Sequence, residues 1–122
     1  DVLRTFRFDP TGMVETEGRI YGKIKRTYSF EDGGRTILER DGGRYGRVVR
    51  VFQYEKRGIS EIEGRGHGEP VRTFVFEKDG KAMTEREGGW FGAAKRTFIF
   101  EGVNLDMLEN PEIFLQFMLL IS

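Results

Sequence analysis

Five short segments of the chain alternate hydrophobic and polar residues with a period of two, and the five resemble one another. Each begins with an arginine, carries aromatic rings at its third and fifth positions and ends on an acid. Successive side chains of a strand point to opposite faces, so the arginine and both rings share one face and each segment predicts a half-buried strand. The segments are residues 4–9, 26–31, 50–55, 72–77 and 96–101.

A hairpin turn is expected after each of the first four segments, because an acid and a glycine lie three positions apart, as in Glu77–Gly80. We expect a three-residue loop that ends at the glycine, which would pair Phe8 with Val14 and Phe6 with Thr16. A four-residue loop would instead shift the return strand by one residue and mix polar with apolar residues on one face. The first register leaves the paired acids on a solvated polar face: Glu15/Glu17, Glu61/Glu63 and Glu85/Glu87.

The return strands share a second pattern, in which an acid and one or two glycines precede an aromatic ring and a final glycine. It occurs at residues 17–22, 41–46 and 87–92, and His67 replaces the ring in residues 63–68. The glycines predict a bulge or bend in each return strand. Successive arginines of the first pattern are 22, 24, 22 and 24 residues apart, so the hairpin is the repeated unit.

The predicted fold is therefore all-β: an antiparallel meander of about nine strands, followed by one C-terminal helix. The sheet either curls into a barrel or forms an open repeat sheet that dimerises. Asn110 and Pro111 form a helix start, and residues 113–121 are apolar nearly all round, which is typical of a buried helix. It could cover the sheet, plug a barrel or pair with a second copy, and it is too short to span a bilayer. We expect one domain over residues 1–122, with the meander in 1–102 and the helical segment in 103–122.

Composition narrows the classes of function. The chain has 20 basic and 20 acidic residues, and this zero net charge argues against binding nucleic acid through its phosphates. It has no cysteine, which excludes disulfides and thiolate chemistry and suits the cytoplasm. We find no catalytic motif, no metal site and no cofactor motif. His67 is the single histidine and has no partners at a spacing typical of a metal or catalytic site.

The recurring arginines are the first candidate site, because they share a face with the buried rings. Buried charge is costly unless it is paired, so an aromatic-lined cavity with these arginines at one end would suit the head group of an apolar anion. The alternative is that each arginine lies at a strand end and pairs with a glutamate or stacks on a ring. The candidate ligand-binding residues are Arg4, Arg26, Arg50, Arg72, Arg96, Tyr28, Phe52, Tyr54 and Phe74.

A second candidate is an interface near the C-terminus. The outer face becomes more apolar there, through Val71, Val75, Met83 and Ile99, and we expect either the helix or another subunit to cover it. An open sheet would favour the subunit, since its edge strands need protection. The candidate interface residues are Trp90, Phe91, Phe114, Phe117 and Leu120.

Residues 4–101 resemble variant MORN-type repeats and, at the same positions, the YD repeats of toxin shells. The likeness rests on units such as Phe74–Gly80 followed by Glu85–Gly88 and Gly92. It implies a scaffold or interaction role, sometimes at membranes, and no chemistry. Lipocalin-like and fatty-acid-binding barrels are similar in having a strand meander, an arginine and an aromatic lining.

Three functions follow as hypotheses. The first is a non-enzymatic binding or scaffold protein that acts through a protein partner or as a homo-oligomer. The second is a small carrier of an apolar anionic molecule, and the third is an enzyme that uses the same cavity.

Overall fold

Nine antiparallel strands follow one another in a single sheet, in the order of the sequence, as the repeats predict. The computed structural model describes residues 3–19, 21–77, 81–101 and 105–121. The strands are β1 (Arg4–Asp9), β2 (Gly12–Glu17), β3 (Ile24–Glu31), β4 (Thr36–Asp41), β5 (Val48–Glu55), β6 (Gly58–Glu63), β7 (Arg72–Phe76), β8 (Ala82–Glu87) and β9 (Ala94–Ile99). Two 3₁₀ turns, at Asp32–Gly34 and Leu105–Glu109, and the helix α1 (Pro111–Ile121) complete the fold.

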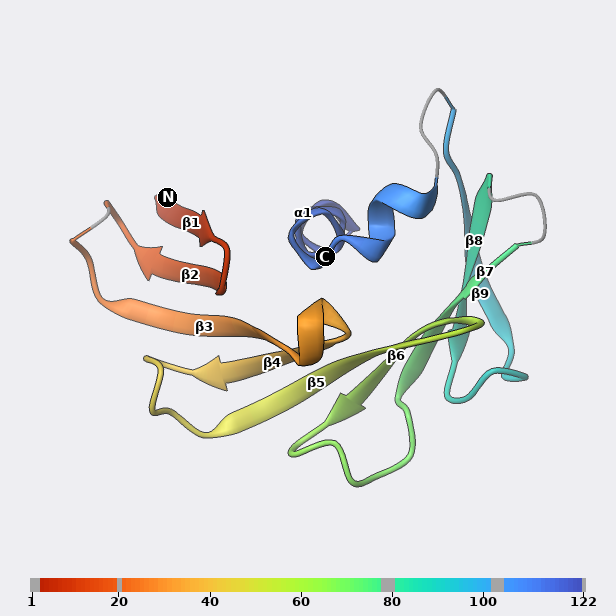
Figure 1. The fold of residues 1–122 in the computed structure, drawn as a ribbon, viewed down its shortest axis with the longest axis horizontal. Helices are drawn as coiled ribbons and strands as arrows, with labels where there is room; N and C mark the ends of the chain where they lie inside the picture. The colour runs from red at the N-terminus through yellow and green to blue at the C-terminus, as the bar shows by residue number, and fades with distance from the viewer. Residues whose placement is uncertain (1–2, 20, 78–80, 102–104, 122) are drawn as a thin grey trace.

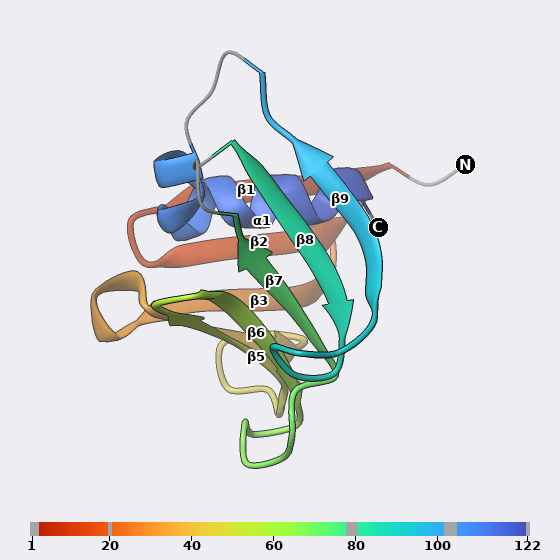
Figure 2. The same ribbon diagram turned by 90° about the vertical axis from the view of Figure 1, so that its right-hand side faces the viewer.

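The sheet curls around α1 but does not close into a barrel (Figure 1). In the described part of the chain, β1 pairs with β2 alone and β9 with β8 alone, so both are edge strands. Figure 2 shows β8 and β9 crossing in front of the helix. The sheet therefore has a concave face, which encloses α1, and a convex face that points outward.

The predicted hairpin register is wrong by one residue. Phe6 lies opposite Glu15 and Phe8 opposite Met13, which is the mixed face that the sequence argument rejected. Shifts of one residue, in opposite directions, likewise put Glu61 opposite Phe52 and Glu85 opposite Phe74. The prediction assumed that the glutamates must face water, whereas on the concave face they neutralise arginines that would otherwise be half-buried without partners.

Turn length explains both this register and the alternating repeat length. Asp9 pairs with Gly12 and Glu55 with Gly58, so these hairpins have two-residue turns. Glu31 pairs with Thr36, so the turn between β3 and β4 has four residues. The extra two residues of the repeat from Arg26 to Arg50 thus lie in this turn and not beside Gly42 and Gly43. Bulges also occur away from the glycines, between Glu15 and Thr16, Glu39 and Arg40, and Glu85 and Arg86.

Helix α1 fills the concave face. Its Phe114 ring is fully buried and lies 5.4 Å from the Phe52 ring and 5.9 Å from the Phe74 ring, both edge-on. Phe117 makes a similar contact with Phe98, at 5.1 Å. The alternative in which the helix covers the apolar outer face is therefore wrong, and Met83 lies in the core beside these rings. The aromatic pairs gave the sheet one strongly apolar face, and the helix buries it.

Candidate functional site

The concave face carries a row of alternating arginines and glutamates, one from each strand, which we call the charge row. Odd-numbered strands supply the arginines and even-numbered strands the glutamates. From β1 to β9 its members are Arg4, Glu15, Arg26, Glu39, Arg50, Glu61, Arg72, Glu85 and Arg96. The shared parity of the five arginines is thus confirmed, and the alternative in which each pairs with a glutamate is the one found.

Bonding along the charge row follows one rule. Each of the first four arginines donates from Nη1 to the glutamate of the following strand, at 3.0 to 3.2 Å. Three arginines use Nε to reach the glutamate of the preceding strand: Arg50 to Glu39 at 3.1 Å, and Arg72 to Glu61 and Arg96 to Glu85 at 2.7 Å each. A chain of ion pairs therefore runs unbroken from Arg26 to Arg96.

The glutamates of the row are buried, where an unpaired carboxylate would be costly. Burial raises the pKa of the Glu39 carboxyl above its ordinary value, and Arg50 and Arg26 offset only part of that rise. For Glu85, burial also acts to raise the pKa, but hydrogen bonds from Arg96 and Arg72 outweigh it and the pKa is lowered. Burial likewise raises the pKa of the neighbouring Tyr28 hydroxyl to about 12. The inward acids are thus not the solvated groups that the sequence argument expected, whereas Glu17, Glu63 and Glu87 are exposed.

The aromatic residues proposed to line a ligand cavity lie beneath the helix. Tyr28, Phe52, Tyr54 and Phe74 are all buried, and Tyr54 donates its hydroxyl hydrogen bond to the Leu108 carbonyl at 2.5 Å. Guanidinium groups stack on two of these rings, Arg50 on Phe52 and Arg72 on Phe74. The space where an apolar ligand would lie is therefore occupied by the protein's own helix.

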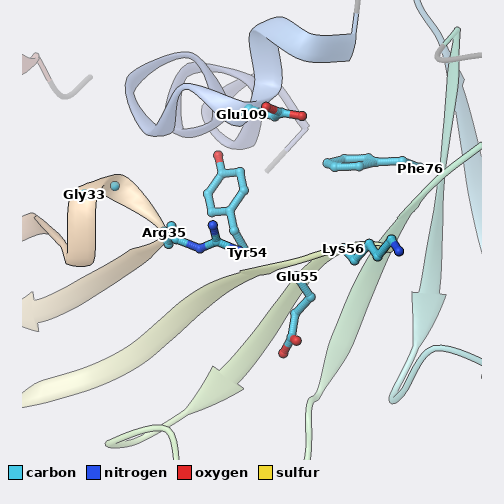
Figure 3. A pocket seen from close by; sticks show the side chains of 8 residues that line it. Gly33, Arg35, Tyr54, Glu55, Lys56, Phe76 and Glu109 are labelled. Atoms are coloured by element: carbon cyan, nitrogen blue, oxygen red, sulfur yellow. The ribbon is translucent and has the colours of Figure 1, made fainter.

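Shallow hollows remain around this core. One of about 370 Å³ borders the charge row at Arg26, Arg50 and Glu61, and one of about 140 Å³ lies between the row and Met118 of the helix. A third, of about 350 Å³, is lined by Arg35, Tyr54 and Glu109, and in Figure 3 the Tyr54 ring points toward the segment that carries Glu109. None of them joins a nucleophile to a base, so we assign them no catalytic chemistry.

Exposed aromatic rings mark the turns that follow β2, β4 and β8. These rings belong to Tyr21, Tyr45 and Phe91 and are 96%, 90% and 86% exposed. The three turns share one geometry, in which the glycine after the ring donates its N–H to the carbonyl three residues earlier, at 2.7 to 3.0 Å. All three turns connect an even-numbered strand to the next odd one, so they lie along one rim of the curled sheet (Figure 1). We call these residues the turn rings.

The glycine after each turn ring is required by close backbone contact. A Cβ atom at Gly22, Gly46 or Gly92 would lie within 1.6 to 1.8 Å of the carbonyl oxygen five residues earlier. The turn between β6 and β7 differs from these three. Pro70 lies there at the position that Ile24, Val48 and Ala94 hold after the other turns, and proline has no N–H to donate. A Cβ atom at Gly68 would accordingly meet nothing within 4 Å. His67 lies on this turn and is exposed.

The predicted interface residues separate into three groups. Phe114 and Phe117 lie in the core, where a partner cannot reach them in this fold. Trp90 is half-buried beside the exposed Phe91, whose ring carries the Arg57 guanidinium at 5.0 Å. Leu120, on the outer side of α1, is 84% exposed. Sequence reasoning grouped these residues by apolar character, but it missed Tyr21 and Tyr45, whose shared place before a turn glycine identifies them.

The chain has no match that would assign it a function. Among the described residues, no group of three or more His, Asp or Glu side chains could hold a metal ion, and no helix is long and apolar enough to cross a membrane. Compared with protein-family models, with curated proteins and with solved structures, the chain finds no match in any of the three.

Proposed function

We propose that this protein is a non-enzymatic interaction module that binds a protein partner through its surface. The single observation that carries the proposal is the set of turn rings: three large side chains exposed at equivalent positions of equivalent turns. Exposed aromatic rings are costly in water and are common anchors of protein interfaces. The turn rings do not contribute to the core, which α1 fills.

The carrier hypothesis has less support. The arginines that would bind an anionic head group donate to buried glutamates, and Phe114 occupies the space beside Phe52 and Phe74 where an apolar chain would lie. A ligand would have to displace the helix before it reached the charge row.

Two measurements on the same preparation test the proposal. Affinity capture with the wild-type protein should recover a protein partner that the triple variant Tyr21→Ser, Tyr45→Ser, Phe91→Ser does not recover, while circular dichroism shows the variant folded. The matched control is Arg7→Ser, on the exposed side of β1. If native mass spectrometry instead finds a monomer with a bound acid of small mass, which Arg50→Ala loses, the protein is a carrier and the proposal fails.

A further inference from the structure

The charge row is incomplete at its β9 end. Arg4, Arg26, Arg50 and Arg72 each donate from Nη1 to the glutamate of the following strand. Arg96 donates from Nε to Glu85 of the preceding strand at 2.7 Å, and the described residues offer its Nη1 no glutamate. Its side chain is 47% exposed. Among the described residues, the other four arginines of the charge row thus have an acceptor for Nη1 on the following strand, and Arg96 has none.

The backbone of β9 is open along the same edge. The Phe100 N–H donates to the Lys81 carbonyl, at 2.9 Å, and therefore points toward β8. Because hydrogen-bonding groups alternate along an antiparallel strand, the backbone groups of Thr97 and Ile99, which follow the bulge of this strand, point away from β8. The strand contains no proline, and Ile99 is 73% exposed. An edge of this kind can accept another strand.

A second copy of this chain would fit the edge poorly. Both edge strands of the sheet are arginine strands, with Arg4 on β1 and Arg96 on β9. Pairing β9 with either edge of another copy would bring guanidinium groups side by side, and like charges opposite one another in a sheet are destabilising. The edge therefore selects against self-association and in favour of a strand that carries an acid.

From this we infer that β9 binds an extended segment of a partner protein that has a glutamate facing Arg96. The even-numbered strands show what such a segment looks like, since all four read apolar–x–Glu–x–acid on the concave face. They are Met13–Glu17, Ile37–Asp41, Ile59–Glu63 and Met83–Glu87.

The hairpin between β7 and β8 gives the register of the bound segment. There Glu85 lies opposite Phe74 and accepts from Nη1 of Arg72, two residues earlier, at 3.1 Å. By the same geometry the partner glutamate lies opposite Phe98, accepts from Nη1 of Arg96, and is followed by an acid opposite Arg96. Its apolar residue lies opposite Phe100, which already packs on Phe117. The inference rests on the proposed function, for which it names a partner and a second surface.

A peptide with the sequence of residues 58–63, GISEIE, is a suitable probe, and GISKIE is its charge-reversed control. Fluorescence anisotropy should show that the wild-type protein binds GISEIE about tenfold or more tightly than GISKIE, since a charge-assisted hydrogen bond is replaced by repulsion. Arg96→Glu should reverse that preference. Arg96→Gln, which leaves Glu85 bonded to Arg72, should abolish the preference and serves if Arg96→Glu does not fold.

Thr97→Pro tests the edge itself. It removes an N–H that points away from β8, so the fold should persist while binding of GISEIE falls at least about tenfold. Arg4→Gln, on the opposite edge, should leave binding unchanged. Equal affinity for the two peptides, no binding of either, or binding that survives Thr97→Pro would each overturn the inference. In each of these cases the proposed function would still hold if capture of a protein partner depends on the turn rings. Conversely, if that capture fails while the peptide still binds, the proposed function alone is overturned.

Discussion

At the scale of single residues, the central feature is a carboxylate shared by two guanidinium groups. Glu61 accepts from Arg50 at 3.1 Å and from Arg72 at 2.7 Å, and its side chain is 8% exposed. Removal of such a carboxylate is strongly destabilising, because two half-buried cations are left without an acceptor. Position along the strand therefore decides what a glutamate contributes.

Replacing Glu61 with alanine should lower the free energy of unfolding by about 3 kcal/mol, because two partly buried arginines lose a partner. Glu63→Ala is the matched control, since Glu63 lies on the same strand and face but is exposed, and its effect should stay within about 0.5 kcal/mol. Urea unfolding of the two variants measures both values. Equal effects would mean that the charge row contributes nothing beyond ordinary surface charge.

Two members of the row should respond to pH in opposite directions. The Glu85 pKa is lowered in the folded protein, so the stability that Glu85 contributes is present above its ordinary pKa of 4.5 and is lost as pH falls through the folded value. The Glu39 pKa is raised, so the folded state takes up a proton and stability falls as pH rises through the window above 4.5.

Urea unfolding should be measured from pH 3 to 7, limits that bracket roughly the ordinary carboxyl range. Two differences in the free energy of unfolding, wild type minus Glu85→Gln and wild type minus Glu39→Gln, should then change with pH in opposite directions. The first difference should shrink as the solution is acidified below 4.5. The second should grow as the pH is lowered toward 4.5 from above. Parallel slopes would contradict the different balance of burial and ion pairing at the two sites.

At the scale of elements, the turns after the even-numbered strands fix where the turn rings point. The hydroxyl groups of Thr5 and Thr27 donate to the carbonyls of Gly18 and Gly42, at 2.7 and 2.8 Å, and thereby tie these turns to the convex face. The threonine that directly follows Arg4 and Arg26 thus holds a turn in each of these repeats. After Arg50 that position is Val51, and the same repeat has the divergent turn with Pro70.

Gly46→Ala should destabilise the fold by about 3 kcal/mol, because its Cβ would lie 1.8 Å from the Asp41 carbonyl oxygen and the turn must open. Gly68→Ala, at the equivalent position of the divergent turn, should change stability by less than about 1 kcal/mol. Thermal unfolding followed by circular dichroism compares them. Similar shifts in the two variants would show that the three turns do not depend on close backbone contact.

The helix should depend on its inward ring. Phe114→Ala removes a ring that contacts Phe52, Tyr54 and Phe74 and should lower the free energy of unfolding by about 4 kcal/mol. Leu120→Ala, on the exposed side of α1, should change it by no more than about 0.5 kcal/mol. Guanidinium unfolding measures the difference. If Phe114→Ala changes the free energy of unfolding as little as Leu120→Ala does, α1 leaves the concave face in solution.

How far the sequence predicts the fold also depends on particular elements. The aromatic pairs and the turns between them are sufficient to predict the strands and their meander order, and the apolar run of residues 113–121 is sufficient to predict a buried helix. The register is harder to predict. Glu15 and Glu17 share a face of the strand, so the assumption that glutamates face water cannot distinguish the buried one from the exposed one. A second regularity carries that information: Glu61 and Glu85 each precede the next arginine of the charge row, Arg72 or Arg96, by 11 residues. The turn rings are recognisable in the sequence as aromatic residues before a glycine, but their exposure is visible only in the structure.

At the scale of the whole molecule, one helix connects distant repeats. Phe114 contacts rings of β5 and β7, and Phe117 contacts rings of β7 and β9, so α1 joins strands that do not neighbour one another. Repeat proteins without such an element can unfold unit by unit. Here we expect a single cooperative transition.

Trp90, the single tryptophan, lies in the turn between β8 and β9 and reports on that end of the sheet. Its fluorescence and the far-ultraviolet circular dichroism should therefore give the same urea midpoint within error, as expected of a two-state domain. A fluorescence transition at lower urea would show that the last hairpin unfolds independently. The same comparison in Phe114→Ala indicates whether the helix is the source of the cooperativity.

The two turn lengths observed among the hairpins, two and four residues, differ by an even number, and this has a consequence for how the gene can change. Inserting a single codon in such a turn would rotate the whole return strand and turn its glutamate outward, away from the arginines, whereas codons added in pairs leave every side chain on its own face. Hairpin turns of this protein can therefore lengthen over evolutionary time, but only by even steps. Parity, more than length, is what selection is expected to preserve.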